Sequence, residues 1–366
     1  MNDQYKIIDT RPIESFKTIS FSGYKKNDVI NSVLKSIETK KIENACHWCC
    51  ECLISGYTLL LWDKLISFYC KIIYINNPNI PNYLYKKNQI LMNQISHLGK
   101  SKGNILLLRN SQMIRNLFFD VVSTLTVSSK TKRYVIPKIN EKEDFLFHNI
   151  QKRLCAQMNI LPSHIMHFND PDELRIILNE IFTLLKNNQF GFEKSCYWIF
   201  WILKWENIHK KNKKAWTLDE REINDIPKKY RADIIWALWE TTLEETKIRN
   251  NKNLTKQILS LFSLFKYNYS VGKRNSRIPL LLNAIAYLTH TINFNTTIRP
   301  DYKTFIQVQG NVNKMFLLKK SSEVKTTQNI EISVKKSKKK KDDIDLEISH
   351  DKISMFNELD SLIMNM

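Results

Sequence analysis

The chain has 366 residues with 43% hydrophobic content, which is enough apolar material for two domains or for one extended helical body. Its seven glycines are too few for many hairpin turns, glycine-rich phosphate loops or barrel corners, so helices are favoured over sheets. The formal net charge of +20 points to an anionic partner, and the odd count of seven cysteines argues against a disulfide framework and for a reducing, intracellular compartment.

The first part of the chain predicts an irregular arm followed by short-looped helices. Residues 1–26 form the expected N-terminal arm, because Pro12 and Gly23 interrupt any helical period. Apolar spacing and cap residues then predict helices over 27–39, 44–54, 57–76, 80–96 and 105–128. Short connections between such helices predict antiparallel hairpins. The polar, basic segment 128–142 contains Pro137 and is the expected boundary within the body.

The second part repeats this style. The predicted helices cover 145–158, 170–187, 193–209, 228–249, 254–267, 279–291 and 301–319. In the second of these, Asp170 is the expected N-cap and Pro171 the first helical residue. A Glu-x-x-Cys-x-Trp pattern begins at Glu43 and again at Glu193, each time opening an amphipathic helix, which indicates two related helical layers.

The expected fold class is therefore all-α, with stacked helical hairpins in one two-part body and a disordered, charged C-terminal tail. The helical subdomains are expected at 27–135 and 136–320. Residues 321–349 are expected to be a disordered charged linker, because they are polar and include a lysine run. Residues 350–366 are expected to form an amphipathic docking helix that binds a protein partner. Its candidate partner-binding side chains are Ile353, Phe356, Leu359, Leu362 and Ile363.

The positive charge belongs mainly to the body. From Lys314 onward, eleven lysines face nine acids, so the tail contributes little of the excess. Nucleic acid is the candidate ligand, although a Lys-, Ile- and Asn-rich composition also follows from AT-rich coding. The candidate phosphate-binding residues are Lys204, Lys210, Lys211, Lys213, Lys214, Lys228, Lys229 and Arg231.

The tryptophans near these lysines have two interpretations. Aromatic rings interleaved with cations can stack on the bases of a single strand. The spacing of three and four residues is also what core packing requires, and burial is the favoured interpretation. The residues concerned are Trp198, Trp201, Trp205, Trp236 and Trp239.

The cysteines of the first pattern raise the question of a metal site. Cys46, Cys49 and Cys50 share one face of the predicted helix, and thiols on one rigid stripe cannot readily surround a metal ion. Core packing is therefore expected, with zinc binding and redox chemistry as alternatives.

Two other constellations are weak. Gly99-Lys100-Ser101 resembles the end of a phosphate-binding loop but lacks the earlier glycine and the preceding strand. His164 and His167 lie near Asp170 between two prolines, and a polar connection is expected there rather than a metal site. No catalytic arrangement can be recognised, so the prediction names no catalytic residue, no metal ligand and no cofactor.

Several short segments carry a resemblance to a known family: Phe21-Ser-Gly-Tyr-Lys25, Ala45-Cys-His-Trp48, Ser55-Gly-Tyr57, Leu61-Trp-Asp63, Asn77-Pro-Asn-Ile-Pro81, Arg115-Asn-Leu-Phe118, Tyr197-Trp-Ile-Phe-Trp201 and Asp233-Ile-Ile-Trp236. With these segments the chain resembles an uncharacterised helical family of nucleocytoplasmic large DNA viruses of the phycodnavirus and mimivirus type. Coverage is roughly residues 20–320, and the resemblance implies an all-α fold without an established activity or site.

The leading hypothesis is a viral non-enzymatic accessory protein of replication, transcription or genome packaging that binds nucleic acid and a protein partner. The alternatives are an internal virion structural protein and an enzyme with an unrecognised helical active site. Export is not expected, because the N-terminus lacks a basic segment followed by an apolar one. A membrane span is not expected either, since Asp63, Lys64 and Lys71 interrupt the most apolar window. The expected location is the host cytoplasm or viral factory, with the virion as a further possibility.

Overall fold

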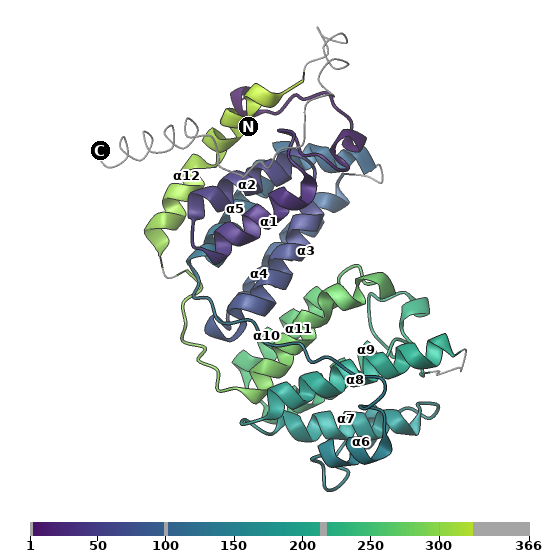
Figure 1. The fold of residues 1–366 in the computed structure, drawn as a ribbon. Coiled ribbons are helices and arrows are strands. Elements are labelled where there is room, and N and C mark those ends of the chain that lie inside the picture. Colours follow the sequence, from purple (N-terminus) through teal and green to yellow (C-terminus); the bar gives the residue numbers. More distant parts are fainter. Residues whose placement is uncertain (1–2, 99–101, 213–217, 300, 325–366) are drawn as a thin grey trace. The chain divides into compact units, whose positions relative to one another are not determined.

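The computed structural model describes residues 3–98, 102–212, 218–299 and 301–324. These residues form helices and no β-strand, so the all-α prediction is confirmed (Figure 1). Within the described segments, no helix combines the length and the hydropathy that a bilayer crossing requires. The tail expected at 321–366 falls outside the described residues from 325 onward, together with its candidate partner-binding side chains.

The α-helices are labelled in Figure 1. They are α1 Lys26–Glu38, α2 Ile42–Ile54, α3 Thr58–Phe68, α4 Ile80–Ser96, α5 Gln112–Val127, α6 Phe147–Arg153, α7 Asp172–Leu185, α8 Gly191–Lys211, α9 Ile235–Arg249, α10 Lys252–Lys266, α11 Val271–Thr289 and α12 Tyr302–Lys319. A π-helix, Tyr69–Ile73, continues α3, and short 3-10 helices lie at Asp3–Tyr5, Ile13–Phe16, Tyr74–Asn76, Lys102–Asn110, Ser163–Ile165, Lys228–Tyr230 and Lys320–Ser322.

Apolar spacing made most helix positions predictable, and side-chain caps fix the starts of α10 and α12. The predicted helix over 80–96 matches α4 at both ends. The Asp301 side chain accepts a hydrogen bond from the backbone of Thr304 at the start of α12, and Asn251 does the same for Leu254 in α10. An oxygen-bearing cap satisfies one of the free N–H groups that every helix start leaves exposed, so it fixes where the helix begins.

Four predicted helix bounds were wrong. The helix expected over 105–128 is broken at Ser111, whose side chain caps Ile114 and starts α5 there. The helix expected from Lys228 begins only at Ile235, and α6 is shorter than the predicted 145–158. In the other direction, α11 starts two turns before Pro279, which lies inside the helix. Tertiary packing overrides the usual preference for proline in the first turn.

The N-cap role predicted for Asp170 was also wrong. Its carboxylate forms a salt bridge of 2.5 Å with Arg221, and both side chains are buried. The helix that follows, α7, starts after Pro171 without a side-chain cap.

Helices pack in consecutive pairs and also across long sequence separations. Neighbours in the chain lie together in the pairs α1 with α2, α7 with α8, and α10 with α11. α10 also packs on α4, and the hydroxyl groups of Tyr69 and Tyr287 lie 2.5 Å apart where the π-helix meets α11. The residues described up to Val324 thus form one compact unit, and the boundary expected at 135/136 stays a prediction.

The final α-helix of the described residues, α12, packs against α5 and α2, which lie far from it in sequence. Phe316 of α12 lies 6.2 Å from the ring of Phe119, and the guanidinium of Arg115 lies over the Phe316 ring at 3.7 Å. Lys319 forms a buried salt bridge of 2.7 Å with Glu51 in α2. Residues 301–319, expected in the second subdomain, therefore pack with helices of the first.

The two copies of the Glu-x-x-Cys-x-Trp pattern place their Cys and Trp residues in the core. Cys46, Trp48, Cys196 and Trp198 are all buried, at the starts of α2 and α8. Burial raises the pKa of the Cys46 and Cys196 thiols well above the ordinary value, so neither forms a nucleophilic thiolate near neutral pH. The packing interpretation of these residues is confirmed.

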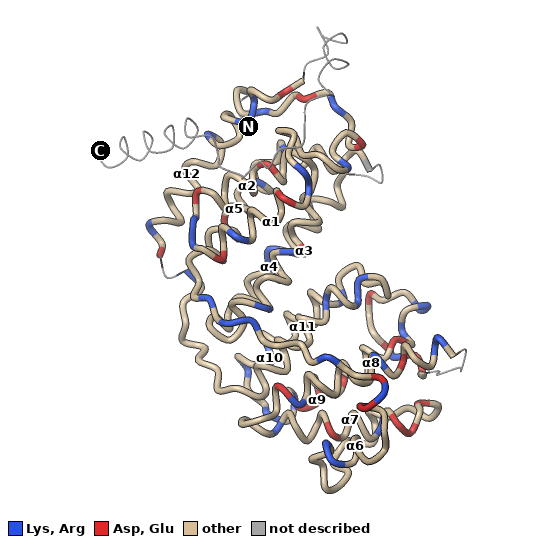
Figure 2. The backbone as a smooth tube through the Cα atoms, in the orientation of Figure 1, with Lys and Arg blue, Asp and Glu red and all other residues tan. Residues whose placement is uncertain are grey.

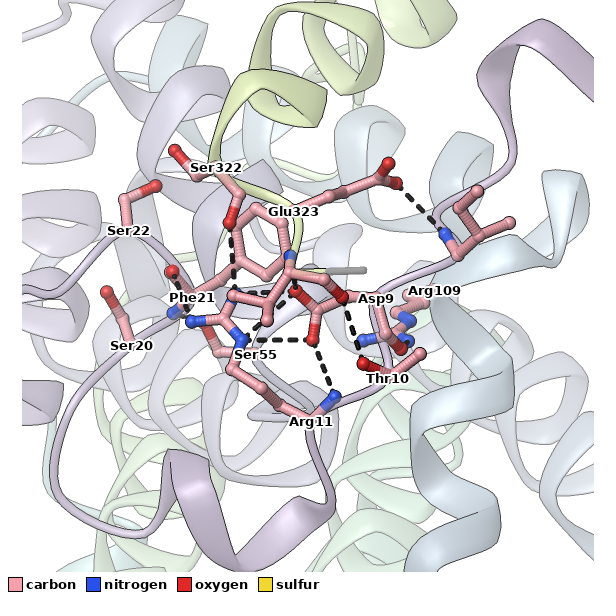
Figure 3. Close-up of polar contacts among 12 residues, drawn as sticks. Asp9, Thr10, Arg11, Ser20, Phe21, Ser22, Ser55, Arg109, Ser322 and Glu323 are labelled. Atoms are coloured by element: carbon pink, nitrogen blue, oxygen red, sulfur yellow. Dashed lines mark hydrogen bonds and ion pairs between the residues drawn. The ribbon is translucent and has the colours of Figure 1, made fainter. Parts of the chain in front are cut away.

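The N-terminal arm and the last described residues hold each other in a clasp, which we define as residues 8–11 and 322–324 (Figure 3). The Asp9 carboxylate accepts the N–H of Val324 at 2.8 Å, and Thr10 donates its N–H to the Val324 carbonyl at 3.1 Å. Arg11 donates to the Ser322 carbonyl and is paired with Asp9 at 2.7 Å. Residues 322–324, expected to belong to the linker, are therefore fixed against the body.

Candidate nucleic-acid interface

The first candidate surface is built on the junction of α3 and the π-helix. Lys64 and Lys71 are seven residues apart, which brings them to one side of a helix after two turns. The π-helix turns Tyr69 and Cys70 inward, where both are buried, and leaves Lys71 half-exposed. The Ile72 carbonyl accepts the N–H of Thr131 at 2.6 Å, which ties the connection between α5 and α6 to this junction.

Like charges meet at Lys71. Partial burial lowers the pKa of its ammonium group below the ordinary value, and the nearby charges of Lys64 and Arg133 lower it further. Within the described segments, the Lys71 ammonium has no carboxylate in salt-bridge range. An anion bound there would relieve a repulsion that the protein itself does not neutralise.

A second cation in this region, Lys130, forms its hydrogen bonds with backbone carbonyl groups. Its ammonium group donates to the carbonyls of Leu125, Thr126 and Ser128, each at 2.7 Å, and so closes the C-terminal end of α5. Burial lowers the pKa of Lys130 to about 8, and the charge of Lys40 adds to the shift. The carbonyl ends of a helix attract a cation, but the surrounding lysines oppose it.

Together these residues form what we call the central basic surface. It consists of Lys40, Lys64, Lys71, Lys130, Arg133 and their exposed neighbour Lys132. The acid next to it is Glu38, which pairs with Arg133 at 3.0 Å on an exposed site. Figure 2 shows Lys and Arg following one another along the connection between α5 and α6.

The cations predicted from the sequence lie elsewhere, around the end of α8 and the Lys228–Tyr230 turn. Lys204 pairs with Glu141 at 2.5 Å, Lys210 with Glu206 at 2.7 Å, and Lys228 lies 3.9 Å from Glu220. We call Lys204, Lys210 and Lys228, together with Lys211, Lys229 and Arg231, the paired basic region.

The remaining members of that prediction have other surroundings. Lys211 is exposed, Lys229 lies 4.9 Å over the Tyr230 ring, and the Arg231 guanidinium donates to the Ile226 carbonyl. Lys213 and Lys214 lie outside the described residues. The structure brings the described cations of that prediction to one region. It also places a carboxylate beside Lys204, Lys210 and Lys228.

Sequence reasoning missed the central basic surface, although two signals were present. The spacing of Lys64 and Lys71 is visible in the sequence, and the segment 128–142 was noted as basic. What the sequence could not show is that these cations and Lys40 converge.

The tryptophans are core residues. Trp198, Trp201, Trp236 and Trp239 are buried, and Trp205 is half-buried against Trp201, with the two rings stacked at 5.4 Å. The burial predicted from their spacing is confirmed for the four, which leaves no face of those rings for a base to stack on.

Several polar side chains that catalysis could use form ion pairs within the protein. An open depression of about 490 Å³ between α4, α5 and α12 contains Lys87 and Asp120, which pair at 2.6 Å, and Asp120 also holds Arg299. His164, of the loose histidine cluster, lies 3.3 Å from Glu244. In the described segments, no group of three or more His, Cys, Asp or Glu side chains has the geometry of a metal site.

Comparisons of the chain with protein families, with curated proteins and with solved structures found no match. The function must therefore be argued from the surfaces of this molecule alone.

Proposed function

We propose that this protein is a non-enzymatic viral accessory protein that binds nucleic acid, and that it holds phosphates on the central basic surface. The observation that carries the proposal is the position of Lys71 beside Lys64 and Arg133 without a carboxylate partner of its own.

The physical argument concerns unbalanced charge. Exposed ion pairs contribute little to stability, so folding alone gives no reason to gather unpaired cations. A phosphate chain supplies regularly spaced negative charges, and its binding releases condensed counterions. Lys64 and Lys71, with Lys132 on the adjoining connection, offer ammonium groups for such contacts.

A protein partner is the second part of the proposal. It rests on the amphipathic pattern of residues 350–366, which lie outside the described residues. Deleting these residues should remove one protein interaction, seen by affinity capture with nuclease present, and leave the melting temperature unchanged. A lower melting temperature would contradict a role limited to partner binding.

The main experiment compares two triple variants that lose the same charge. The test variant is K64Q/K71Q/K132Q, and the matched control K211Q/K228Q/K229Q lies in the paired basic region. Binding of labelled DNA and RNA is measured by fluorescence anisotropy over a range of salt concentrations. Each lost phosphate contact lowers the salt dependence, so the slope for the test variant should fall by about 2 and its affinity by about tenfold or more.

The control should retain most of the affinity and slope of the wild type. An equal loss of affinity in the two triple variants would contradict binding at the central basic surface, because it would show that the overall charge of the protein decides binding. If the wild type fails to bind at about 50 mM salt, the proposed function itself is wrong. The melting temperatures of both variants verify that each protein is folded.

A further inference from the structure

Burial of the tryptophans leaves two phenylalanine rings as the most exposed aromatic side chains of the described residues. Phe147 is 80% exposed and Phe168 is 99% exposed. Exposure of a large apolar ring to water is unfavourable. A molecule that covers the ring therefore binds with an added favourable free energy. The charges around the two rings indicate which molecule each could accept.

Phe147 is the first residue of α6, directly after the basic connection that leaves the central basic surface. Its position is set by the turn before it. The Leu146 N–H and the Asn149 side chain both donate to the Glu143 carbonyl, at 3.2 and 3.0 Å. Asp144 in the same turn accepts from Tyr197 of α8 at 2.9 Å, so the start of α6 is anchored to the core.

The charges near Phe147 favour an anion. Lys142 precedes it and Lys152 follows in the last turn of α6. Three acids also lie in the preceding turn, but two of them are matched by cations: Glu141 pairs with Lys204 at 2.5 Å, and Asp144 with Arg153 at 3.3 Å. Glu143 is exposed and remains as the local negative charge.

Phe168 has the opposite surroundings. The backbone and side chain of its neighbour Asn169 donate to the exposed carboxylate of Asp219, at 3.0 and 2.9 Å. Asp172 and Glu173 follow at the start of α7. This acidic setting repels phosphate, so Phe168 is a natural control of the same residue type.

We propose that Phe147 stacks on an unpaired base of a single-stranded nucleic acid whose phosphates continue along residues 130–142 to the central basic surface. The inference rests on the proposed function and adds the strand type. A duplex keeps its bases stacked on each other, whereas a single strand offers a free face to an aromatic ring. DNA and RNA share this chemistry, and every base has such a face.

The experiment measures affinity for single strands of about twenty nucleotides, as DNA and as RNA, and for the matching duplexes. F147A should bind single strands about tenfold or more weakly than the wild type, while duplex affinity changes less than about twofold. F147W should restore single-strand binding, because it keeps a stacking ring. F168A should bind like the wild type.

An abasic strand of the same length tests the stacking contact itself. Wild type and F147A should bind it equally, because no base is present to stack. Single-strand affinity that is unchanged in F147A would overturn the inference, and so would an equal loss for duplex and abasic strands. In both cases the salt-dependent defect of K64Q/K71Q/K132Q would remain, which separates a failed inference from a failed proposed function.

Discussion

The central basic surface and the paired basic region contain the same kinds of side chain but differ in how their charge is balanced. Around α8, Glu141, Glu206 and Glu220 accompany the lysines. Around the π-helix, Lys71 faces Lys64 and Arg133 instead. A dense run of lysines in the sequence is therefore a poor measure of local positive potential, because distant segments supply the compensating acids.

The paired basic region also adjoins a buried ionic cluster of Arg274, Glu206 and Asp233. The Arg274 guanidinium lies 2.8 Å from both Glu206 and Asp233, and all three side chains are buried. Tyr269 donates to the other Asp233 oxygen at 2.8 Å. Arg274 thus holds buried carboxylates of two segments together, whereas Lys64 and Lys132 of the central basic surface are exposed to solvent.

The largest expected effect on stability comes from removing Arg274 from this buried ionic cluster. R274A leaves two buried carboxylates without their shared partner, so the free energy of unfolding should fall by about 3–5 kcal/mol. Chemical denaturation at neutral pH measures the change. The matched control is K210Q, which removes a mostly exposed partner of Glu206 and should cost less than about 1 kcal/mol. Equal losses of unfolding free energy in R274A and K210Q would contradict the importance assigned to the buried Arg274 contacts.

A smaller effect concerns the pH dependence of stability through Lys130. Its folded-state pKa of about 8 lies below the ordinary 10.5, so between these values the unfolded chain binds more protons than the folded one. The stability of wild type relative to K130M should therefore rise as pH increases from 8 to 10.5, by on the order of 1–2 kcal/mol. Denaturant unfolding at several pH values gives the difference, and a flat difference would contradict the prediction.

The smallest expected effect is a gain in stability. K71M removes a cation that its neighbours repel, so it should stabilise the protein by about 0.5 kcal/mol at low salt, and the gain should shrink as salt screens the repulsion. The same variant should bind nucleic acid more weakly. The control K204Q breaks an ion pair and should not stabilise. A destabilised K71M would mean that packing of the lysine stem outweighs charge.

Helices were largely predictable from the sequence because their signals are local. The spacing of apolar residues and caps such as Asn251 act within one or two turns. One failure arose where a distant residue competed, because Arg221 binds the Asp170 carboxylate that was expected to cap α7. The candidate surface was harder for the same reason. Lys40, Lys71 and Arg133 become neighbours only when α1, the π-helix and the connection after α5 pack together.

The clasp has a mechanical consequence. A pull on the chain beyond Val324 is carried first by the hydrogen bonds to Asp9 and Thr10, before any tension reaches α12. These bonds act side by side with the Arg11 contact to Ser322, so they share the load. A load applied beyond Val324 would therefore enter the body at a point braced by its own N-terminal segment, which would reduce the strain on α12.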